Sequence, residues 1–488
     1  MLLTDRQIKN IFIYILPKFL GYGLNLLTLP ILTRILSPDD FGVIVLALVF
    51  PTIAVAVVTA GIPFSVPRYF FEYHKDETAL NRLYFSTQLY LLIMFIASTA
   101  TVYFAKDFIS VLITGATVYG IAVFISYITA YLGQVNQIYL RIYQNMEKAT
   151  LHSVFVILQI VISIVMSLGL VLHYKMSYMG MIYGSFAGAL ISSLVMAFHF
   201  NKTVKAVFSR KILIENIKYG LQIVPKSFAG FINRFFDKYM LNAMLSISVV
   251  GVYSIGQTIT NAIDVLMGNV WMAFRPAIYK EVFDKGDKAS VGVGRLFSVF
   301  SFVTLLPLLL IILFAEEVIY IIAPPAYYGA VNIIVILAAG LTTQTFGISV
   351  GVQYEYSKKP FLIFPVTVVS TILNVLLNTF LIPRYGLAGA GFSAMASLSA
   401  MNFIFTYIGQ KLYRIQYEWK TVISMYALIV SSMLTVLYFR EMGHGHLYFY
   451  TAKLIYIALF LLVGMRAKII TRESVAKVSG IIFKSSVA

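Results

Sequence analysis

The sequence predicts an all-α polytopic membrane protein with about 14 transmembrane helices, arranged as two pseudo-symmetric six-helix lobes and a C-terminal helix pair. Three observations lead to this fold class: an apolar composition, an uneven distribution of positive charge among the loops, and an internal repeat. Of the 488 residues, 60% are apolar or aromatic and 12% are Asp, Glu, Lys or Arg. A soluble protein cannot bury so much apolar surface, and the long unbroken apolar runs exclude an outer-membrane barrel, whose strands alternate.

Apolar windows of about 20 residues, taken in order, give the candidate spans. The signal Ser37-Pro38-Asp39-Asp40 combines an N-cap, a proline in the first turn and acidic residues, which predicts the start of the second helix there. The 14 spans lie near residues 10–33, 40–63, 83–105, 115–140, 151–172, 178–200, 216–236, 249–272, 293–315, 327–352, 360–382, 386–409, 419–438 and 446–465.

The distribution of positive charge supports this number of spans. The chain has 37 Lys and Arg against 20 Asp and Glu, a formal net charge of +17. With both termini on one side of the membrane, 27 of the cations fall on that side and six on the other. Because cationic loops are retained in the cytoplasm, we expect both termini to be cytoplasmic. The asymmetry accounts for the net charge through loops that face anionic lipid, so no nucleic-acid partner is expected.

The two halves of the chain match each other at an offset of about 208 residues. Because this offset holds six spans, an even number, both halves would have the same orientation in the membrane, as in a parallel repeat. The matched positions are Pro17-Lys18 with Pro225-Lys226, Asn25 with Asn233, Ser37 with Ser246, Gly42 with Gly251, Arg68 with Arg275 and Gln144 with Gln353.

The repeat predicts the organisation of the chain. Residues 1–200 form an N-lobe with helices 1–6, residues 201–215 a cytoplasmic connector, and residues 216–409 a C-lobe with helices 7–12. Residues 410–466 add helices 13 and 14, and residues 467–488 form a basic cytoplasmic tail. Two such lobes predict alternating access with the substrate between them. Since both lobes belong to one chain, we expect a monomer.

Two lysines are predicted to lie at matching depths inside the membrane. Lys18 lies about 12 Å into the first span, and Lys226 matches it in the seventh. A lysine at the centre of a span costs about 2.5–3.5 kcal/mol and therefore suggests a function, although each could instead snorkel to the cytoplasmic face. Asn25 and Asn233, seven residues further on, share the faces of these lysines, and Arg234 lies at the edge of this stripe. Such a stripe favours an anionic ligand such as a phosphate group.

Two acidic residues are candidates for ion coupling or for pairing with a cavity cation. Asp264, in the eighth span, shares one helix face with Gln257, Asn261 and Gly268. It could bind a coupling proton or sodium ion, or it could be a hydrogen-bonded structural residue. Asp237 could pair with the arginine three residues before it. No arrangement typical of a catalytic or metal site is present, and the chain has no cysteine, so we expect neither enzymatic activity nor a bound cofactor or metal.

Three stretches carry a family resemblance. They are Thr33-Arg34-Ile-Leu-Ser-Pro-Asp-Asp-Phe-Gly42, the segment from Phe236-Asp237-Lys238 to Val250-Gly251-Val-Tyr253, and the segment from Asn374 to Ile382-Pro383-Arg-Tyr-Gly386. In order and spacing, from about residue 8 to residue 410, they resemble the bacterial oligosaccharide flippases known as Wzx. That family belongs to the superfamily of multidrug and toxin extruders and lipid II flippases.

The resemblance implies a substrate and a role for each candidate residue. The chain would move an undecaprenyl-pyrophosphate-linked oligosaccharide repeat unit from the cytoplasmic to the periplasmic leaflet of a bacterial inner membrane, for O-antigen, capsule or exopolysaccharide assembly. Lys18 and Lys226 would neutralise the pyrophosphate, Arg234 would assist, and Asn25 and Asn233 would contact sugar. The polyprenyl tail would stay in lipid at the seam between the lobes. Coupling to a proton or sodium gradient is implied, and a polysaccharide polymerase or chain-length machinery is an implied partner.

Other functions remain open on the sequence. A multidrug cation antiporter has the same fold, but its cavity would favour acidic or aromatic residues over lysines. A lipid II flippase would differ in being needed for growth. A membrane glycosyltransferase or polysaccharide polymerase would usually carry a large extramembrane segment, whereas the longest predicted loop here lies at about residues 273–292.

Overall fold

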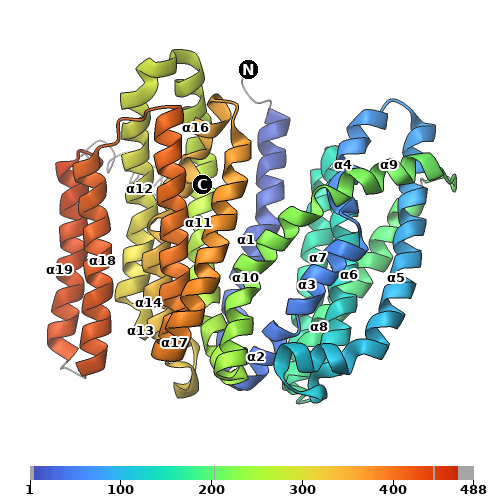
Figure 1. Ribbon diagram of the computed structural model, residues 1–488, viewed down its shortest axis with the longest axis horizontal. Helices are drawn as coiled ribbons and strands as arrows, with labels where there is room; N and C mark the ends of the chain where they lie inside the picture. The colour runs from blue at the N-terminus through green and yellow to red at the C-terminus, as the bar shows by residue number, and fades with distance from the viewer. Residues whose placement is uncertain (1–4, 203, 443–445, 471–488) are drawn as a thin grey trace, which may run out of the picture. The chain divides into compact units, whose positions relative to one another are not determined.

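The computed structural model describes residues 5–202, 204–442 and 446–470 (Figure 1). The side chains of residues 5–12, 15, 18, 226–234 and 446–447 lie outside this description. All regular secondary structure in the described residues is helical. The chain is an all-α polytopic membrane protein, as its sequence predicts.

The chain folds as two compact units, which are described separately. Unit 1 comprises Met1–Ser254 and Ile322–Ala326, and unit 2 comprises Ile255–Ile321 and Tyr327–Ala488. The predicted lobes, at residues 1–200 and 216–409, were defined by the internal repeat rather than by contacts, and they remain a prediction.

The helices of unit 1 include a row of long antiparallel neighbours, α5 to α8 (Figure 1). Its elements are α1 (Asp5–Thr33), α2 (Pro38–Leu46), α3 (Val49–Val58), α4 (Ile62–Tyr73), α5 (Glu77–Thr114), η1 (Thr117–Tyr119), α6 (Gly120–Asn145), α7 (Ala149–Leu172), α8 (Ser177–Asn201), α9 (Arg210–Leu221), α10 (Val224–Met244) and the first turns of α11 (Ile247–Lys285).

The helices of unit 2 surround α12 and α14, and α18 and α19 lie side by side (Figure 1). After the remainder of α11, the elements are η2 (Gly286–Ala289), α12 (Ser290–Leu313), α13 (Ala315–Ile322), η3 (Pro325–Tyr327), α14 (Ala330–Leu341), α15 (Gln344–Ser349), α16 (Gly351–Tyr356), η4 (Pro360–Leu362), α17 (Ile363–Leu412), α18 (Trp419–Met442) and α19 (His446–Arg466).

Each of the 14 predicted spans coincides with helix. Among the described residues, nine continuous stretches are long and apolar enough to cross a membrane, or up to ten if a bent pair counts as one span. Two of these stretches, Ile247–Leu313 and Pro360–Leu412, each hold two predicted spans. The second one is divided at Gly386, whose φ of +56° ends one helix and begins the next. The bent pair, Pro325–Leu341 with Gln344–Tyr356, coincides with the span predicted at 327–352. Helix α1 coincides with the predicted span at 10–33, and α10, together with α9, coincides with the one at 216–236.

Several predicted spans differ from the structure in their continuity. The span expected at 327–352 is divided into α14, α15 and α16. The span expected at 40–63 consists of α2, α3 and α4, and its last break lies at Ala60 and Gly61, which both have positive φ. The span expected at 216–236 is divided into α9 and α10, and α9 begins inside the predicted connector. At the breaks of the last two spans, the backbones come into contact: a Cβ on Gly61 would lie 2.2 Å from the carbonyl oxygen of Gly220 in α9. Only glycine allows this approach.

The connector is held on the end of α5 by polar side chains. The backbone N–H of Lys205 donates to Asn81, that of Ser209 donates to Ser86, and the Asn216 side chain donates to Thr87 over 3.1 Å. These bonds satisfy groups that would otherwise be left unpaired between helices. They position α9 across the ends of α4 and α5 (Figure 1).

The repeat is visible in the way two helices begin. Ser37 accepts a hydrogen bond from the N–H of Asp40 at the start of α2, which confirms the predicted N-cap, and the Asp40 side chain completes a capping box. Its repeat partner Ser246 accepts from the N–H of Val249 at the start of α11. The glycines that follow them face the opposite helix: a Cβ on Gly42 would lie 2.1 Å from the Ile247 oxygen, and one on Gly251 1.9 Å from the Pro38 oxygen. The matched glycines therefore serve the close contact of matched helix starts.

Candidate substrate-binding elements

The first candidate stripe lies on α1. This helix packs on α7, where the Ser153 hydroxyl donates to the carbonyl of Ile13 over 2.6 Å and Gly21 leaves room for Ile160. Pro17 lies inside the helix, as expected, and Asn25 is exposed. Asn25 is therefore accessible to a ligand, whereas the side chain of Lys18 lies outside the description.

The matching stripe lies on α10. The side chains of Lys226, Asn233 and Arg234 all lie outside the described part of the chain, so their roles remain a prediction. Pro225 lies in the first turn of α10, whereas its repeat partner Pro17 lies inside α1. A proline costs nothing in a first turn, because the N–H it lacks would have no helical partner.

Asp237 is buried at a helix contact in unit 1. Its carboxylate accepts a hydrogen bond of 3.3 Å from the hydroxyl of Tyr253 in α11. The buried ammonium of Lys238 lies 5.5 Å from the centre of the Phe235 ring and 5.9 Å from that of Tyr253. The sequence placed Lys238 in an outer loop, whereas the structure gives it a buried aromatic environment. These contacts of Asp237 and Lys238 with Tyr253 join α10 to α11.

Asp264 lies in α11, in the part that belongs to unit 2, and is partly buried. On the same face, Asn261 is exposed, and a Cβ placed on Gly268 would meet nothing within 4 Å. This face of α11 is therefore partly accessible and compatible with a polar lining.

Two arginines that the sequence assigned only to loops make specific contacts. In unit 1, Arg68 lies between the rings of Tyr69 and Tyr219, with its guanidinium carbon 4.7 and 4.6 Å from their centres, and it pairs with Glu72. In unit 2, its repeat partner Arg275 stacks on Tyr279 at 4.8 Å and pairs with Glu355 at 3.6 Å.

These two arginines are about half exposed, so their free edges remain available to an anion. The repeat matched the two positions but gave no indication of the stacking, because the aromatic partners come from different places in each unit.

A third arginine, Arg141, reaches from α6 to α4. It donates to the carbonyl of Pro63 over 3.1 Å and stacks on Phe64 at 4.7 Å. The carbonyl oxygen of Pro63 lies in the first turn of a short helix. Arg141 is therefore a structural link between the two helices, which its position near the end of a predicted span did not reveal.

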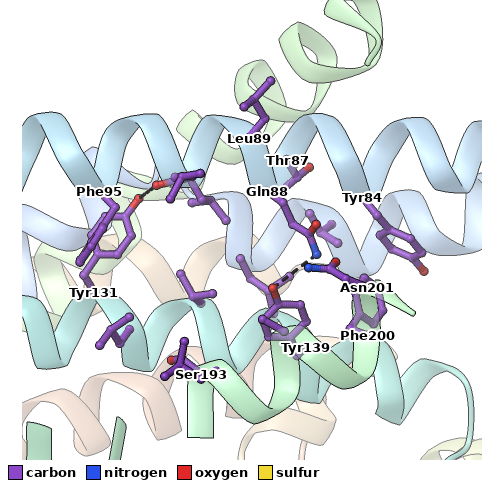
Figure 2. A pocket seen from close by; sticks show the side chains of 18 of the residues that line it. Tyr84, Thr87, Gln88, Leu89, Phe95, Tyr131, Tyr139, Ser193, Phe200 and Asn201 are labelled. Atoms are coloured by element: carbon purple, nitrogen blue, oxygen red, sulfur yellow. Dashed lines mark hydrogen bonds between the residues drawn. The ribbon is translucent and has the colours of Figure 1, made fainter. Parts of the chain in front are cut away.

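An apolar groove crosses unit 1 between α5, α6 and α8 (Figure 2). Its cavity volume is about 610 Å³, with α6 as the floor and α5 and α8 as the walls. Leu92 and Leu194 line its rim and are mostly exposed. Phe95 and Tyr131 lie at one end, and Gln88, Tyr139 and Asn201 gather at the other. Since these faces are mostly apolar in sequence, nothing in the sequence distinguished a groove from a packed contact.

Unit 2 contains an ion pair whose lysine is buried and whose glutamate is partly exposed. Lys453 of α19 bonds to Glu317 of α13, and its ammonium lies 5.1, 4.1 and 4.9 Å from the ring centres of Phe314, Phe449 and Tyr450. Lys453 is only 1% exposed. Lys453 lies within the span predicted at 446–465, and its partner comes from a helix more than a hundred residues earlier in the chain.

Similar folds occur in solved transporters. The lipid II flippase MurJ in an inward closed conformation gives a TM-score of 0.71 at 14% identity, over 99% of this chain and 100% of that chain. An inward-facing multidrug resistance MATE family transporter of the MOP superfamily gives 0.67 at 16% identity, over 80% and 93%. A MOP superfamily transporter from Pyrococcus furiosus gives 0.56 at 16% identity, over 83% and 95%. At these identities the likeness concerns the fold.

Sequence comparison gives a more specific result. The chain is 23% identical over 286 residues to an uncharacterized membrane protein of Methanocaldococcus jannaschii, a match that covers 57% of this chain and 56% of that protein. The chain thus spans about half the length of this curated relative. Residues 8–282, more than half of the chain, match the family described as polysaccharide biosynthesis protein. With its polytopic helical fold, the chain belongs to the polysaccharide biosynthesis protein family.

Proposed function

We propose that this protein is a flippase that moves an undecaprenyl-pyrophosphate-linked oligosaccharide repeat unit from the cytoplasmic to the periplasmic leaflet of a bacterial inner membrane by alternating access. The observation that carries the proposal is the family match over residues 8–282, because this family acts in polysaccharide biosynthesis. The fold supports it, since a lipid II flippase is among the solved proteins with a similar fold.

The chemistry of the chain is consistent with a diphosphate ligand. Lys18 and Lys226 occupy matching positions in the repeat, each directly after a proline, and their helices are α1 and α10. A lysine in a span is costly unless it meets an anion, a carboxylate or water. In the proposed mechanism the two ammonium groups bind the pyrophosphate, Arg234 assists, and Asn25 and Asn233 bind sugar hydroxyls. Asp264 is the residue of α11 that we propose for proton or sodium coupling.

The proposal is tested in proteoliposomes that contain a fluorescent undecaprenyl-pyrophosphate oligosaccharide. Translocation is followed as protection of the fluorophore from a membrane-impermeant quencher. We expect Lys226→Ala to slow translocation by about 10- to 100-fold, because a hydrogen bond to a charged group contributes roughly 1.5–3 kcal/mol. The exposed Lys359→Ala, which removes the same charge elsewhere, should retain the wild-type rate.

Each outcome has a distinct meaning. Translocation that needs Lys226 but not Lys359 would support the flippase and its anion site together. Equal rates in all three proteins would keep the flippase and reduce Lys226 to a lysine that snorkels to the interface. If the wild type moves none of a panel of lipid-linked glycans, the proposed function is wrong.

A lipid II flippase is the second candidate, because the MurJ fold matches this chain over its whole length. The same proteoliposomes with fluorescent lipid II compare the two substrates directly. Loss of growth on depletion of the protein would favour lipid II, whereas loss of surface polysaccharide in growing cells would favour the repeat unit. A cation-coupled multidrug exporter would instead extrude cationic dyes, which an efflux assay measures.

A further inference from the structure

A second groove, of about 430 Å³, lies on unit 2 between α18 and α19, which Figure 1 shows side by side. Ala427 of α18 and Leu459 and Leu462 of α19 line this α18–α19 groove and are exposed. By contrast, Met425 and Ile429, on another face of α18, are buried. The groove therefore opens away from the core of unit 2. Because it opens to the bilayer, a lipid chain fills it, and the residues at its ends decide which lipid is favoured.

Two cations lie at one end of the α18–α19 groove. Arg466, in the last turn of α19, is itself part of the lining. Lys420, at the start of α18, lies four residues before Ser424 and seven before Ala427, both of which line the groove, so it shares their helix face. Both cationic side chains are exposed. A basic end of this kind, between two membrane helices, is suited to a phosphate headgroup.

Neither of these cations is paired with an acid in the described part of the chain. The acid closest to them in sequence, Glu418, lies on a different face of α18 from Lys420 and is bound by Arg295 of α12 over 3.2 Å. Arg295 also donates to the carbonyls of Ala467 and Lys468, which fixes the end of α19. This end of the groove therefore carries positive charge that an anionic headgroup would neutralise and a zwitterionic one would not.

The other end of the groove is closed by a contact between the two helices. Thr435, four residues after the lining residue Ser431, shares a hydrogen bond of 2.8 Å with Tyr456, three residues before Leu459. On α18 the lining runs from Ser424 to Ser431, about 10 Å at a rise of 1.5 Å per residue. One leaflet contributes about 15 Å of hydrocarbon, half of a core of about 30 Å. The groove thus fits the upper part of one acyl chain, whose phosphate lies at the basic end.

We propose that the α18–α19 groove binds an anionic phospholipid, with one acyl chain between the two helices and the phosphate held by Lys420 and Arg466. Such a lipid neutralises one cation on each helix and fills the space between them, so it stabilises the helix pair. The inference does not rest on the proposed function, because this lipid is bound as part of the folded protein and is not transported.

The test is photocrosslinking of the full chain in phosphatidylcholine nanodiscs to phosphatidylglycerol that carries a diazirine in one acyl chain. We expect the crosslinks to concentrate on peptides of α18 and α19. Ala427→Trp and Val463→Trp place an indole in the groove from its two walls, and each should reduce the yield on these peptides at least about fivefold by occupying the volume of the chain. Ala458→Trp, at an exposed position of α19 outside the lining, is the matched control and should retain the yield.

Two further variants examine the basic end without filling the groove. Arg466→Gln and Lys420→Gln should each weaken phosphatidylglycerol binding about fivefold, the effect of one basic group near a membrane surface. Lys411→Gln, which removes an exposed cation from the last turn of α17, should leave this binding unchanged.

The melting temperature separates lipid binding from a purely structural role of the cations. Phosphatidylglycerol added to micelles should raise the melting temperature of the wild type, because a ligand that binds the folded state stabilises it. Arg466→Gln should reduce this rise but keep the melting temperature without added lipid, because it breaks no ion pair with a described residue. An equal loss with and without the lipid would contradict the proposal.

Competition identifies the occupant. Replacing part of the phosphatidylcholine by unlabelled phosphatidylglycerol should abolish the crosslinks on α18 and α19, whereas the same replacement by phosphatidylethanolamine should not. Equal competition by phosphatidylethanolamine would overturn the proposal, because the groove would then not select an anionic headgroup. Stronger competition by a polyprenyl diphosphate would also overturn it and assign the groove to the lipid-linked substrate. Neither result bears on whether the protein translocates a glycan, which the proteoliposome assay measures separately.

Discussion

The middle of helix α5 of unit 1 and helix α14 of unit 2 are both apolar but have very different surroundings. Leu92, Ile93 and Ile96 of α5 are each more than half exposed, whereas Ile333, Ile334 and Val335 of α14 are fully buried. The reason is how the neighbours are distributed: α14, only 12 residues long, packs against α12, α17 and α18, while the 38-residue α5 packs mainly against α6 and less extensively against α3, α4 and α9. In a membrane both arrangements are stable, because lipid tails are as apolar as a protein core. An open groove therefore costs unit 1 little.

Among the variants that test this comparison, we expect the largest loss of stability at the ion pair of unit 2, between Glu317 and Lys453. We expect Glu317→Leu to lower the free energy of unfolding by about 3–5 kcal/mol, because it leaves the buried Lys453 ammonium without its carboxylate. The double variant Glu317→Leu/Lys453→Met should recover most of that loss. Unfolding by denaturant in detergent micelles measures both.

The matched control in unit 1 is Glu77→Leu, which breaks an exposed pair with Lys205. An exposed pair of this kind contributes at most about 1 kcal/mol. If Glu317→Leu costs no more than Glu77→Leu, the ion pair of unit 2 does not hold α19 to α13.

The second prediction compares two aliphatic side chains directly. Ile334→Ala should destabilise unit 2 by about 2–3 kcal/mol, near the lower end of the range for core deletions, because it opens a cavity but loses little water-driven free energy in a membrane. Leu92→Ala, at the rim of the groove, should cost less than about 0.5 kcal/mol. Thermal unfolding in micelles ranks the two. Equal losses would mean that the groove is closed in the folded protein.

The third prediction concerns the tight contacts of unit 1 itself. Gly251→Ala should destabilise the protein by about 1–3 kcal/mol, because the added Cβ would lie 1.9 Å from the carbonyl oxygen of Pro38 and the helix starts must separate. Gly133→Ala in α6 meets nothing within 4 Å and should instead stabilise the helix by up to about 1 kcal/mol. A neutral Gly251→Ala would show that the contact of α2 with α11 can relax.

Much of the fold could be predicted because it depends on local properties of the sequence. Every predicted span lies on helix, and the N-cap at Ser37 forms as its residues indicate. The breaks were harder to predict. Gly61 resembles many glycines in apolar helices, and only its contact with Gly220 shows that the chain must bend there. Similarly, the division of the seventh span into α9 and α10 depends on polar bonds to α5 that no local pattern reveals.

The candidate site, like the fold, could be predicted from the sequence only in part. The repeat indicated the two helices, α1 and α10, that carry Lys18 and Lys226, because duplication preserves residue identity at a fixed offset. It gave no indication of the partners of Arg68, Lys238 or Lys453, since Tyr219, Tyr253 and Glu317 each lie on another helix. The apolar groove was equally invisible, because leucines that line a cavity and leucines that fill one have the same periodicity.

The sequence by itself determined that the chain is helical and crosses the membrane many times, because only helices and closed barrels pair their backbones in lipid and the unbroken apolar runs exclude a barrel. It also determined where α2 begins, through the N-cap at Ser37, whose preference is local. Only the tertiary structure decided which apolar faces pack and which stay open, and which buried charges meet. The physical reason is that packing in a membrane depends on shape and on long-range pairing, neither of which hydropathy encodes.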